Sequence, residues 1–328
     1  MDGKDLPPAG FTAPDPLAFA CGRRQKKVIK REELKEGNKE ISIGNEMSIT
    51  PFQALACPLD GTPLHRHGAT WRCASGHSFD IASQGYTNLL PVQHKRSRDP
   101  GDSKEMVAAR RRFLTAGFYQ PIAAAVSRAV LAGLPTDATS SCLDAGCGEG
   151  YYMRQLAAAV GDEQTLALLG LDISKWAVLA AAKQDKRVNW VVGSNAHLPV
   201  LPGTLDRVLC MFGFPVYPEF ARVLKPGGRL VQVDAGPDHL RELREIIYPS
   251  LKPERTADLQ TPEGFIRLPT ETLRFSVELT SAEQIADLLA MTPHLYRAKA
   301  EGRAEAAALT ALSLSVDVRL TCFERGRG

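Results

Sequence analysis

One glycine-rich stretch constrains the fold of this chain more than any other. A short apolar run reaches Asp144 and is followed by glycines at three alternate positions, Gly146, Gly148 and Gly150. Glycine permits positive φ angles and has no Cβ, so a ligand can lie against the backbone where the next helix begins. The pattern therefore predicts a strand, a tight turn and a helix that together form part of a binding site.

A second acidic residue supports a nucleoside-binding site at this turn. The next apolar run, 166–171, ends at Asp172, about 20 residues after the turn, where a doubly wound fold places its ribose-binding carboxylate. The ligand is then a dinucleotide or S-adenosylmethionine. Pyrophosphate would be repelled by Asp144 and Glu149, whereas carboxylates at the mouth of the turn favour the positive charge of a sulfonium amino acid.

Two motifs together indicate the fold class. The spacing of Asp144 and the three glycines resembles the first motif of class I methyltransferases, and 224–228 (LKPGG) resembles the turn before their fifth strand. Further apolar runs alternate with helical segments, which predicts a mostly parallel sheet with helices on both faces. The resemblance implies a Rossmann-like sheet of seven strands that ends in a reversed pair, 276–279 and 312–323. The alternative is a glycine turn that serves only close packing.

Composition limits the compartment. No apolar run approaches the ~20 residues that a membrane span needs, and residues 1–20 lack the basic start and apolar block of a signal peptide. Seven cysteines, an odd number scattered along the chain, do not form a disulfide framework. We therefore expect a cytoplasmic protein with no membrane partner. The sequence leaves the oligomeric state open, and a homodimer is one of the states considered.

The chain divides into four predicted segments. Residues 1–48 contain prolines and a charged run with little apolar periodicity, which predicts a mostly disordered extension. Translation could begin at Met47, in which case the extension before it would result from a misplaced start codon. Residues 49–92 are expected to form a zinc-ribbon-like hairpin domain and residues 93–120 a basic linker with a cap helix. Residues 121–328 are expected to form the methyltransferase domain.

Two pairs of candidate metal ligands bracket a short hairpin. Cys57 and Asp60 form one pair, and Cys73 and His77 form the other. Ligand pairs on opposite turns resemble a zinc ribbon, in which a tetrahedral ion replaces the core that so short a segment cannot build. Asp60 stands where a cysteine would be expected. Its oxygen is a harder ligand than a thiolate, so it should weaken zinc binding.

The alternative is a hairpin that needs no metal. Cys57 and Cys73 would then be ordinary buried thiols. His65 and His67 could be substitute ligands, or they could simply be solvated. The apolar side chains available to such a hairpin are Leu59, Leu64, Trp71 and Phe79.

A basic segment precedes the predicted core. A loop from His94 leads to a helix expected to begin near Ser103, with Asp102 and Glu105 spaced as a capping box, and to stop at Gly117. Residues 95–112 hold seven basic and three acidic side chains, although the whole chain carries a net charge of only +3. Such a patch suits a phosphate backbone, and a solvated helix face is the alternative. The candidate phosphate contacts are Lys95, Arg96, Arg98, Arg110, Arg111 and Arg112.

Together these features resemble the 23S rRNA (guanine-N1)-methyltransferases, the ribosomal large-subunit methyltransferase A family. The resemblance runs from about Cys57 to the C-terminus, and its most specific pieces are 85–91, 93–102 with 109–111 and Gly117, 144–152, 170–174 and 236–240. It implies S-adenosylmethionine-dependent methylation of guanine N1 in a hairpin of 23S rRNA. It also implies that Cys57, Cys73 and His77 bind zinc, with Asp60 at the remaining position. Cofactor contacts would include Tyr119, Gly148, Glu149 and His239.

The chemistry of two of these residues leaves alternatives. The ring of Tyr119 could lie over the sulfonium or pack on the adenine, as a cation–π partner worth ~0.5 to 2 kcal/mol, or it could be a core residue. His239, just beyond the fifth predicted strand, could face the cofactor or cap the next helix.

The residue that accepts the proton of guanine N1 is not evident. The stretch 210–215 (CMFGFP) lacks the Asn or Asp followed by two prolines that holds the amine in adenine methyltransferases. Cys210 also lacks the preceding proline of a cytosine-C5 nucleophile, so we expect it in the core. A small-molecule methyltransferase would share the glycine turn, and the basic segment favours RNA over it. An inactive RNA-binding module is disfavoured because Asp144, the glycines and Asp172 are all present.

Overall fold

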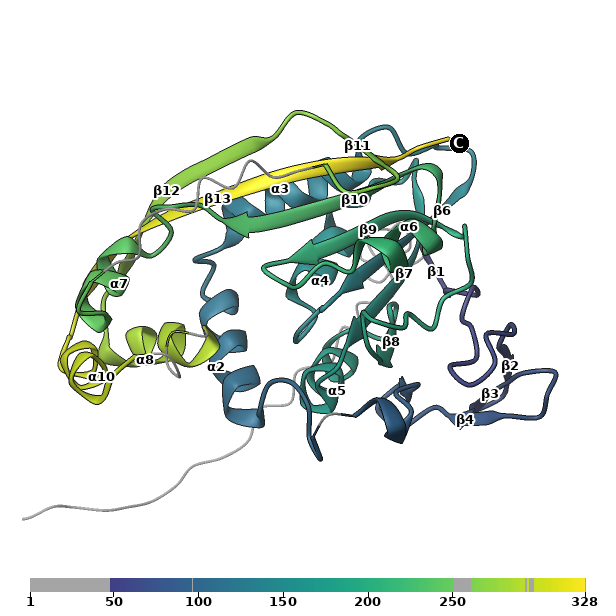
Figure 1. Cartoon of the computed structure of the whole chain (residues 1–328), viewed down its shortest axis with the longest axis horizontal. Coiled ribbons are helices and arrows are strands. Elements are labelled where there is room, and N and C mark those ends of the chain that lie inside the picture. Colours follow the sequence, from purple (N-terminus) through teal and green to yellow (C-terminus); the bar gives the residue numbers. More distant parts are fainter. Residues whose placement is uncertain (1–47, 96, 251–260, 293, 295–297, 328) are drawn as a thin grey trace, which may run out of the picture. The chain divides into compact units, whose positions relative to one another are not determined.

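The computed structural model describes residues 48–95, 97–250, 261–292, 294 and 298–327 (Figure 1). Of the predicted extension only Ser48 is among them, and Arg96 also lies outside the described residues. No helix in these ranges is long and apolar enough to cross a membrane.

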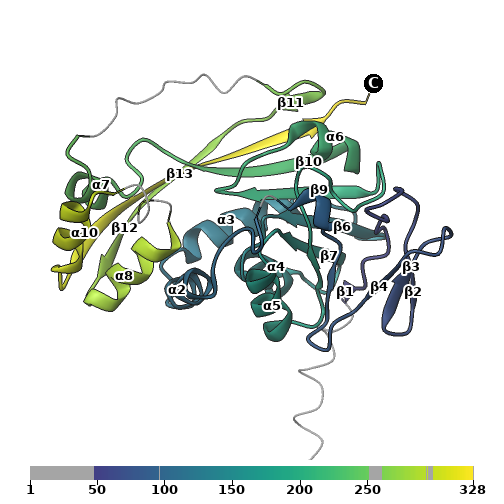
Figure 2. The same cartoon turned by 60° about the horizontal axis from the view of Figure 1, so that its bottom comes forward.

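A ten-stranded sheet forms the centre of the described chain. Its first five strands in the order below are parallel, and β13 is antiparallel to both of its neighbours. Figures 1 and 2 show β10, β13 and β12 side by side. The predicted pair is therefore present, but β12 runs with the parallel strands and only its partner is reversed. The seven expected strands lie in the order β8 (Asn189–Val192), β7 (Thr165–Asp172), β6 (Thr139–Ala145), β9 (Leu205–Met211), β10 (Leu224–Ala235), β13 (Leu312–Arg325) and β12 (Glu271–Leu279).

Three short strands extend this sheet beyond the predicted seven. β1 (Ile49–Thr50) pairs parallel with β7, β5 (Tyr86–Asn88) pairs parallel with β8, and β11 (Phe265–Arg267) pairs antiparallel with β13. Strands of two or three residues are too short to give a recognisable alternation of apolar residues. Both ends of the predicted hairpin segment thus contribute strands to the ten-stranded sheet.

The two faces of the sheet bury separate apolar clusters. Cys142 and Leu143 are neighbours on β6 but belong to different clusters, because successive side chains of a strand point to opposite faces. The second face is covered by α6 (Tyr217–Val223) and by apolar residues of the N-terminal segment, such as Phe52. The first cluster includes residues of α3 (Gln120–Leu131), α4 (Tyr151–Ala159), α5 (Lys175–Gln184) and α7 (Arg241–Ile247).

The hairpin forms a separate small sheet of β2 (His65–His67), β3 (Thr70–Arg72) and β4 (Ser78–Asp80). Leu64 and Trp71 are almost fully buried, but they belong to the cluster on the second face of the large sheet. Leu59 is 51% exposed, so it does not belong to the apolar hairpin cluster considered as the alternative to a metal site. The hairpin therefore packs on the apolar core of the large sheet instead of building a core of its own.

The cap helix α2 (Lys104–Thr115) packs on α8 (Ala282–Met291), and α10 (Ala300–Ala307) follows. The predicted start of α2 is shifted by one residue. Ser103 is the N-cap, and its hydroxyl accepts a hydrogen bond from the backbone N–H of Met106 at 3.3 Å. Asp102 does not cap the helix. Its carboxylate forms an ion pair with Arg110 instead.

Candidate active site

A cavity of about 730 Å³ lies where the parallel strands end. Its wall includes the glycine turn after β6, Asp172 at the end of β7, Phe212 just after β9 and Asp234 near the end of β10. Carboxyl ends of parallel strands meet at one edge of a sheet, which is where open α/β folds bind their ligands. The volume is in the range of cofactor sites.

The glycine turn has the backbone that its sequence predicts. Gly146, Gly148 and Gly150 have φ angles of 101°, 56° and 83°, a region that other residues adopt at a cost. Gly150 is the N-cap of α4, and a Cβ there would lie 2.5 Å from the ring of Trp190. Nothing lies within 4 Å of a Cβ built on Gly146. Close packing therefore explains Gly150, whereas Gly146 leaves open space at the cavity.

Asp172 is held in place by the backbone on both sides. Its Oδ2 accepts a hydrogen bond from the N–H of Gly148 at 2.9 Å, and its Oδ1 accepts one from the N–H of Ser174 at 2.8 Å. Burial raises the pKa of this carboxyl, and the two hydrogen bonds oppose that shift. Each oxygen keeps a second lone pair, so a fixed acceptor pair faces a cavity in which a ribose would donate two hydroxyls.

The other two acidic residues of the turn do not form the expected pair of free carboxylates. Asp144 is fully buried, is absent from the cavity wall, and has no hydrogen-bond partner among the described residues. Burial, with the charge of Asp172, raises its pKa to about 8. Glu149 lines the cavity, but its carboxylate is bound by Arg154 and Gln184. The predicted pair of carboxylates at the mouth of the turn is therefore not present.

Tyr119 and His239 meet across the cavity wall. The Tyr119 hydroxyl and the His239 Nε2 lie 3.3 Å apart, and both side chains are buried. Burial lowers the pKa of His239 to about 4, so its ring is neutral at pH 7. Its Nδ1 has no hydrogen-bond partner among the described residues. The ring does not cap α7, because the N-cap is Leu240, which has a φ of 53° and no side-chain cap bond.

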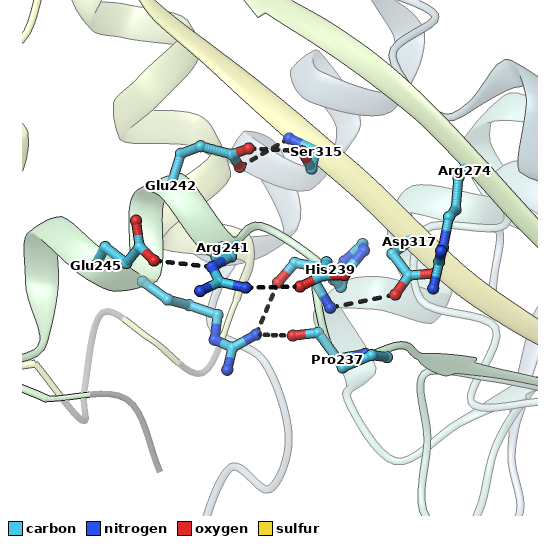
Figure 3. Close-up of polar contacts among 10 residues, drawn as sticks. Pro237, His239, Arg241, Glu242, Glu245, Arg274, Ser315 and Asp317 are labelled. Carbon is cyan, nitrogen blue, oxygen red and sulfur yellow. Dashed lines mark hydrogen bonds and ion pairs between the residues drawn. The ribbon is translucent and has the colours of Figure 1, made fainter. Parts of the chain in front are cut away.

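Partly buried polar contacts fix the turn that carries His239 (Figure 3). Asp317 on β13 accepts hydrogen bonds from the backbone N–H of Asp238 at 3.2 Å and from Arg274 Nε at 3.0 Å. Arg244 donates to the carbonyls of Pro237 and His239. The sequence motif at 236–240 thus orients a ring toward the cavity.

Two aromatic residues after β9 were not anticipated. Phe212 has a φ of 51°, lines the cavity, and places its ring 5.7 Å from that of His239 in a nearly parallel orientation. Phe214 also lines the cavity and is 87% exposed. Backbone strain of this kind clusters at functional sites. The position of Phe212 and Phe214, directly after a strand that ends at the cavity, is the sequence feature that could have indicated them. Cys210, by contrast, is fully buried as expected.

Asp234 is a further cavity residue that the sequence did not single out. Its Oδ2 accepts a hydrogen bond from Gln232 Nε2 at 2.7 Å, and Gln232 Oε1 accepts one from the Tyr217 hydroxyl at 3.1 Å. Burial raises the pKa of this carboxyl. These hydrogen bonds fix the Asp234 carboxylate, whose pKa is raised, in the same cavity wall as Phe212 and Phe214.

The predicted basic face of the cap helix is divided among three environments. Successive residues of a helix point about 100° apart, so three consecutive arginines cannot share one face. Arg110 lines the cavity, and Arg112 pairs with Asp287 on α8 at 2.5 Å. Arg111 is exposed, and within the described ranges no ion pair engages it, Lys95 or Arg98. Arg110 and Arg112 therefore have partners within the chain, and their contacts to phosphate stay predictions.

The four candidate metal ligands come together in one cluster. Donor atoms of Cys57, Asp60, Cys73 and His77 all lie within 4.8 Å of one another, and neither His65 nor His67 belongs to the cluster. His77 Nδ1 is 3.4 and 3.3 Å from the two sulfurs and 3.2 Å from Asp60 Oδ2. A tetrahedral zinc ion needs sulfur–nitrogen edges of about 3.6 Å and a nitrogen–oxygen edge of about 3.4 Å. The donor set therefore fits zinc.

Thr62 fixes the carboxylate of Asp60. Its hydroxyl and backbone N–H donate to Oδ1 at 2.6 and 3.0 Å, which leaves Oδ2 directed at the cluster. These bonds hold the pKa of Asp60 well below its usual range. Asp60 is thus presented as a charged ligand through one oxygen.

Comparison with known proteins places both parts of the chain. A family described as "RlmA, N-terminal", a zinc ribbon, matches residues 55–98, and a methyltransferase-domain family matches residues 142–228. A "Putative 23S rRNA (guanine-N(1)-)-methyltransferase" of Micromonospora griseorubida is 36% identical over 73% of this chain and 85% of its own length. One of the same description from Bacillus subtilis is 30% identical over 81% and 95%. A "23S rRNA (guanine(748)-N(1))-methyltransferase" of Streptomyces fradiae is 36% identical over 58% and 66%.

Proposed function

Because the chain belongs to the 23S rRNA (guanine-N1)-methyltransferases, we infer that it transfers a methyl group from S-adenosylmethionine to N1 of a guanine in a hairpin of 23S rRNA. The observation that carries this inference is the cavity itself. It joins the held carboxylate of Asp172 to the exposed aromatic side chain of Phe214 at one edge of the sheet.

Asp172 and the glycine turn would hold the cofactor. The ribose hydroxyls would donate to the two oxygens of Asp172, and the rest of the molecule would lie against the open backbone at Gly146. Tyr119 and the neutral ring of His239 would contact it from the other wall. The cofactor supplies the reactive methyl group, so the protein must align it and exclude water.

Phe212 and Phe214 would receive the target base. A guanine inside a paired stem cannot reach the cofactor, so it must be turned out, and extruded bases are stacked on aromatic side chains. Phe214 offers an exposed ring, and Phe212 is backed by His239. Asp234 is the carboxylate that would accept the N1 proton, because burial raises its pKa and Gln232 fixes its orientation.

The RNA backbone would contact basic side chains that no ion pair engages among the described residues. Arg98 and Arg111 are exposed, and Lys95 is half-buried. Lys95 and Arg98 lie in the loop that leads to Gly101 and Asp102 on the cavity wall, and Arg111 lies on the outer side of α2. Lysine and arginine contacts to phosphates fix the register of a nucleic acid without reading its sequence. Arg96 belongs to the same loop but lies outside the described residues.

The four-ligand cluster would bind a structural zinc ion. Two thiolates, one imidazole and one carboxylate oxygen close a tetrahedral site with no open position, so the ion would hold the two turns of the hairpin together and take no part in methyl transfer. The residues proposed to bind it are Cys57, Asp60, Cys73 and His77.

Methylation of defined acceptors tests this function. The purified protein would be incubated with S-adenosylmethionine and 23S rRNA hairpin fragments, and the nucleosides would be identified by mass spectrometry. We expect 1-methylguanosine in one hairpin and its loss in Phe214→Ala, with Val92→Ala as the control for an exposed apolar residue (79% exposed) outside the cavity. Equal methylation of free guanosine would favour a small-molecule enzyme.

A further inference from the structure

We propose that Arg110 binds the carboxylate of the methionine portion of S-adenosylmethionine and that Asp102 is the positioning residue for its guanidinium. The proposal rests on the proposed function, because it names a further residue for the same cofactor. It reassigns an arginine that the sequence placed among the RNA contacts.

Arg110 lies beside the glycine turn of the cavity. Its side chain leaves α2 toward the glycine turn, and Nη1 lies 3.6 Å from a Cβ built on Gly148. The N–H of the same Gly148 donates to Asp172, the proposed ribose-binding carboxylate. The guanidinium therefore lies beside the turn along which the cofactor must pass from its ribose to its amino-acid end.

The described wall of the cavity carries more acidic than basic side chains. Among the described residues of its wall, the acidic side chains are Asp102, Glu149, Asp172 and Asp234, and Arg110 is the one lysine or arginine. The carboxylate of the ligand would be repelled by the unpaired acids, because like charges in a site of low dielectric destabilise one another. Arg110 is thus the side chain that can neutralise it.

The contacts of Arg110 leave donors for a ligand. Nη1 forms an ion pair with Asp102, and Nη2 donates to the carbonyl of Met291 at 3.1 Å. A guanidinium has five N–H groups, so three remain. Asp102 is itself fixed, because its carbonyl accepts a hydrogen bond from the Ser174 hydroxyl at 2.7 Å. The fork is therefore held in place before any ligand arrives, which suits bidentate binding of a carboxylate.

A purely structural role is the competing explanation. Arg110 also ties α2 to the end of α8, and such a tie would support any ligand of the cavity equally. The two explanations differ in one respect. Only carboxylate recognition depends on whether the ligand carries that group.

The test compares S-adenosylmethionine with its decarboxylated form, which lacks only the carboxylate, by calorimetry. The wild type should bind the full cofactor about 10- to 100-fold more tightly, the range for a charged hydrogen bond. Arg110→Gln should reduce this ratio to near one, whereas Arg128→Gln, at an exposed arginine of α3 outside the cavity wall, should leave it unchanged. Equal weakening of both ligands by Arg110→Gln would overturn the proposal in favour of the tie.

Two further measurements separate the possible failures. Arg110→Lys keeps the charge but not the fork, and it should give an intermediate ratio. It replaces Arg110→Gln if that variant does not fold, and an unchanged ratio would also overturn the proposal. None of these experiments needs RNA. A wild type that binds the cofactor with the expected ratio but methylates no rRNA would refute the proposed function and leave the role of Arg110 standing.

Discussion

The cavity and the hairpin that carries the four candidate zinc ligands differ in what stabilises them. The strands that form the cavity edge pair over as many as seven residues and bury two large apolar clusters, so the backbone holds each side chain. Each strand of the hairpin has three residues, and all three residues of β2 are exposed. The hairpin must therefore rely on its four ligands and on the few side chains that it packs on the larger core.

Two aspartates illustrate the difference. The carboxylate of Asp172 is fixed by backbone N–H groups of the cavity turn, whereas that of Asp60 is fixed by Thr62, two residues away. Loss of Asp172 should remove a contact to a ligand and two hydrogen bonds of the cavity turn, and it should leave the hairpin unchanged. Loss of Asp60 should remove a part of what holds the hairpin together.

Glycine-to-alanine substitutions should separate the two regions most strongly. Gly150→Ala introduces a Cβ 2.5 Å from Trp190 at a φ of 83°, which should lower the free energy of unfolding by ~3 to 5 kcal/mol. Gly76→Ala, at a φ of 86° in the hairpin, meets nothing within 4 Å and should cost only ~1 to 2 kcal/mol. Denaturant unfolding measures both, and equal losses would mean that the cavity turn is no more tightly packed than the hairpin.

Asp172→Ala should affect the cavity alone. We expect S-adenosylmethionine to bind more weakly by ~1.5 to 3 kcal/mol in calorimetry, the scale of charged hydrogen bonds. Zinc content should not change. Asp137→Ala on the surface serves as the control. Unchanged cofactor affinity, or tighter binding of a nicotinamide cofactor, would remove the assignment of this carboxylate.

Asp60→Cys should affect the hairpin alone. A third thiolate should hold zinc more tightly, by ~1 to 2 kcal/mol in chelator competition, because thiolate is a softer ligand than carboxylate. The hairpin should also resist proteolysis better. Asp80→Cys, exposed on β4 and outside the cluster, adds a thiol without a new ligand and should change neither property. A full equivalent of zinc retained by the wild type through prolonged chelation would contradict a weak site.

Neutralising the three proposed phosphate contacts, the exposed Arg98 and Arg111 and the half-buried Lys95, should give the smallest effect per residue. Replacing Lys95, Arg98 and Arg111 by Gln should reduce the slope of log K against log[salt] for rRNA binding by ~2 to 3 in all, about 0.7 to 0.9 per phosphate contact. Arg112→Gln, whose partner is Asp287, should leave the slope unchanged. An unaltered slope in the triple variant would show that these residues form only a solvated surface.

Local patterns predicted the parts of the site that depend on backbone geometry. The glycine turn, Asp172 and the four clustered ligands are each visible within a short stretch of sequence. Two additional short strands from the N-terminal segment were missed, because β1 and β5 are stabilised by pairing with distant strands rather than by their own sequence.

Side-chain direction could not be predicted in the same way. The three arginines of α2 look equivalent in the sequence, but tertiary partners on α8 and in the loop before α2 give each a different environment. Asp144 fits the motif, but its side chain is fully buried and is not part of the cavity wall. The left-handed backbone of Phe212 depends on the turn after β9 and leaves no composition signal.

The most direct measurement is mass mapping of modified guanines in the 23S rRNA of a strain that lacks this protein. We predict that one 1-methylguanosine disappears from a hairpin and returns when the wild-type protein is supplied, but not when Asp172→Ala is supplied. An unchanged set of methylated guanines would contradict the central claim that the cavity methylates guanine N1 of rRNA.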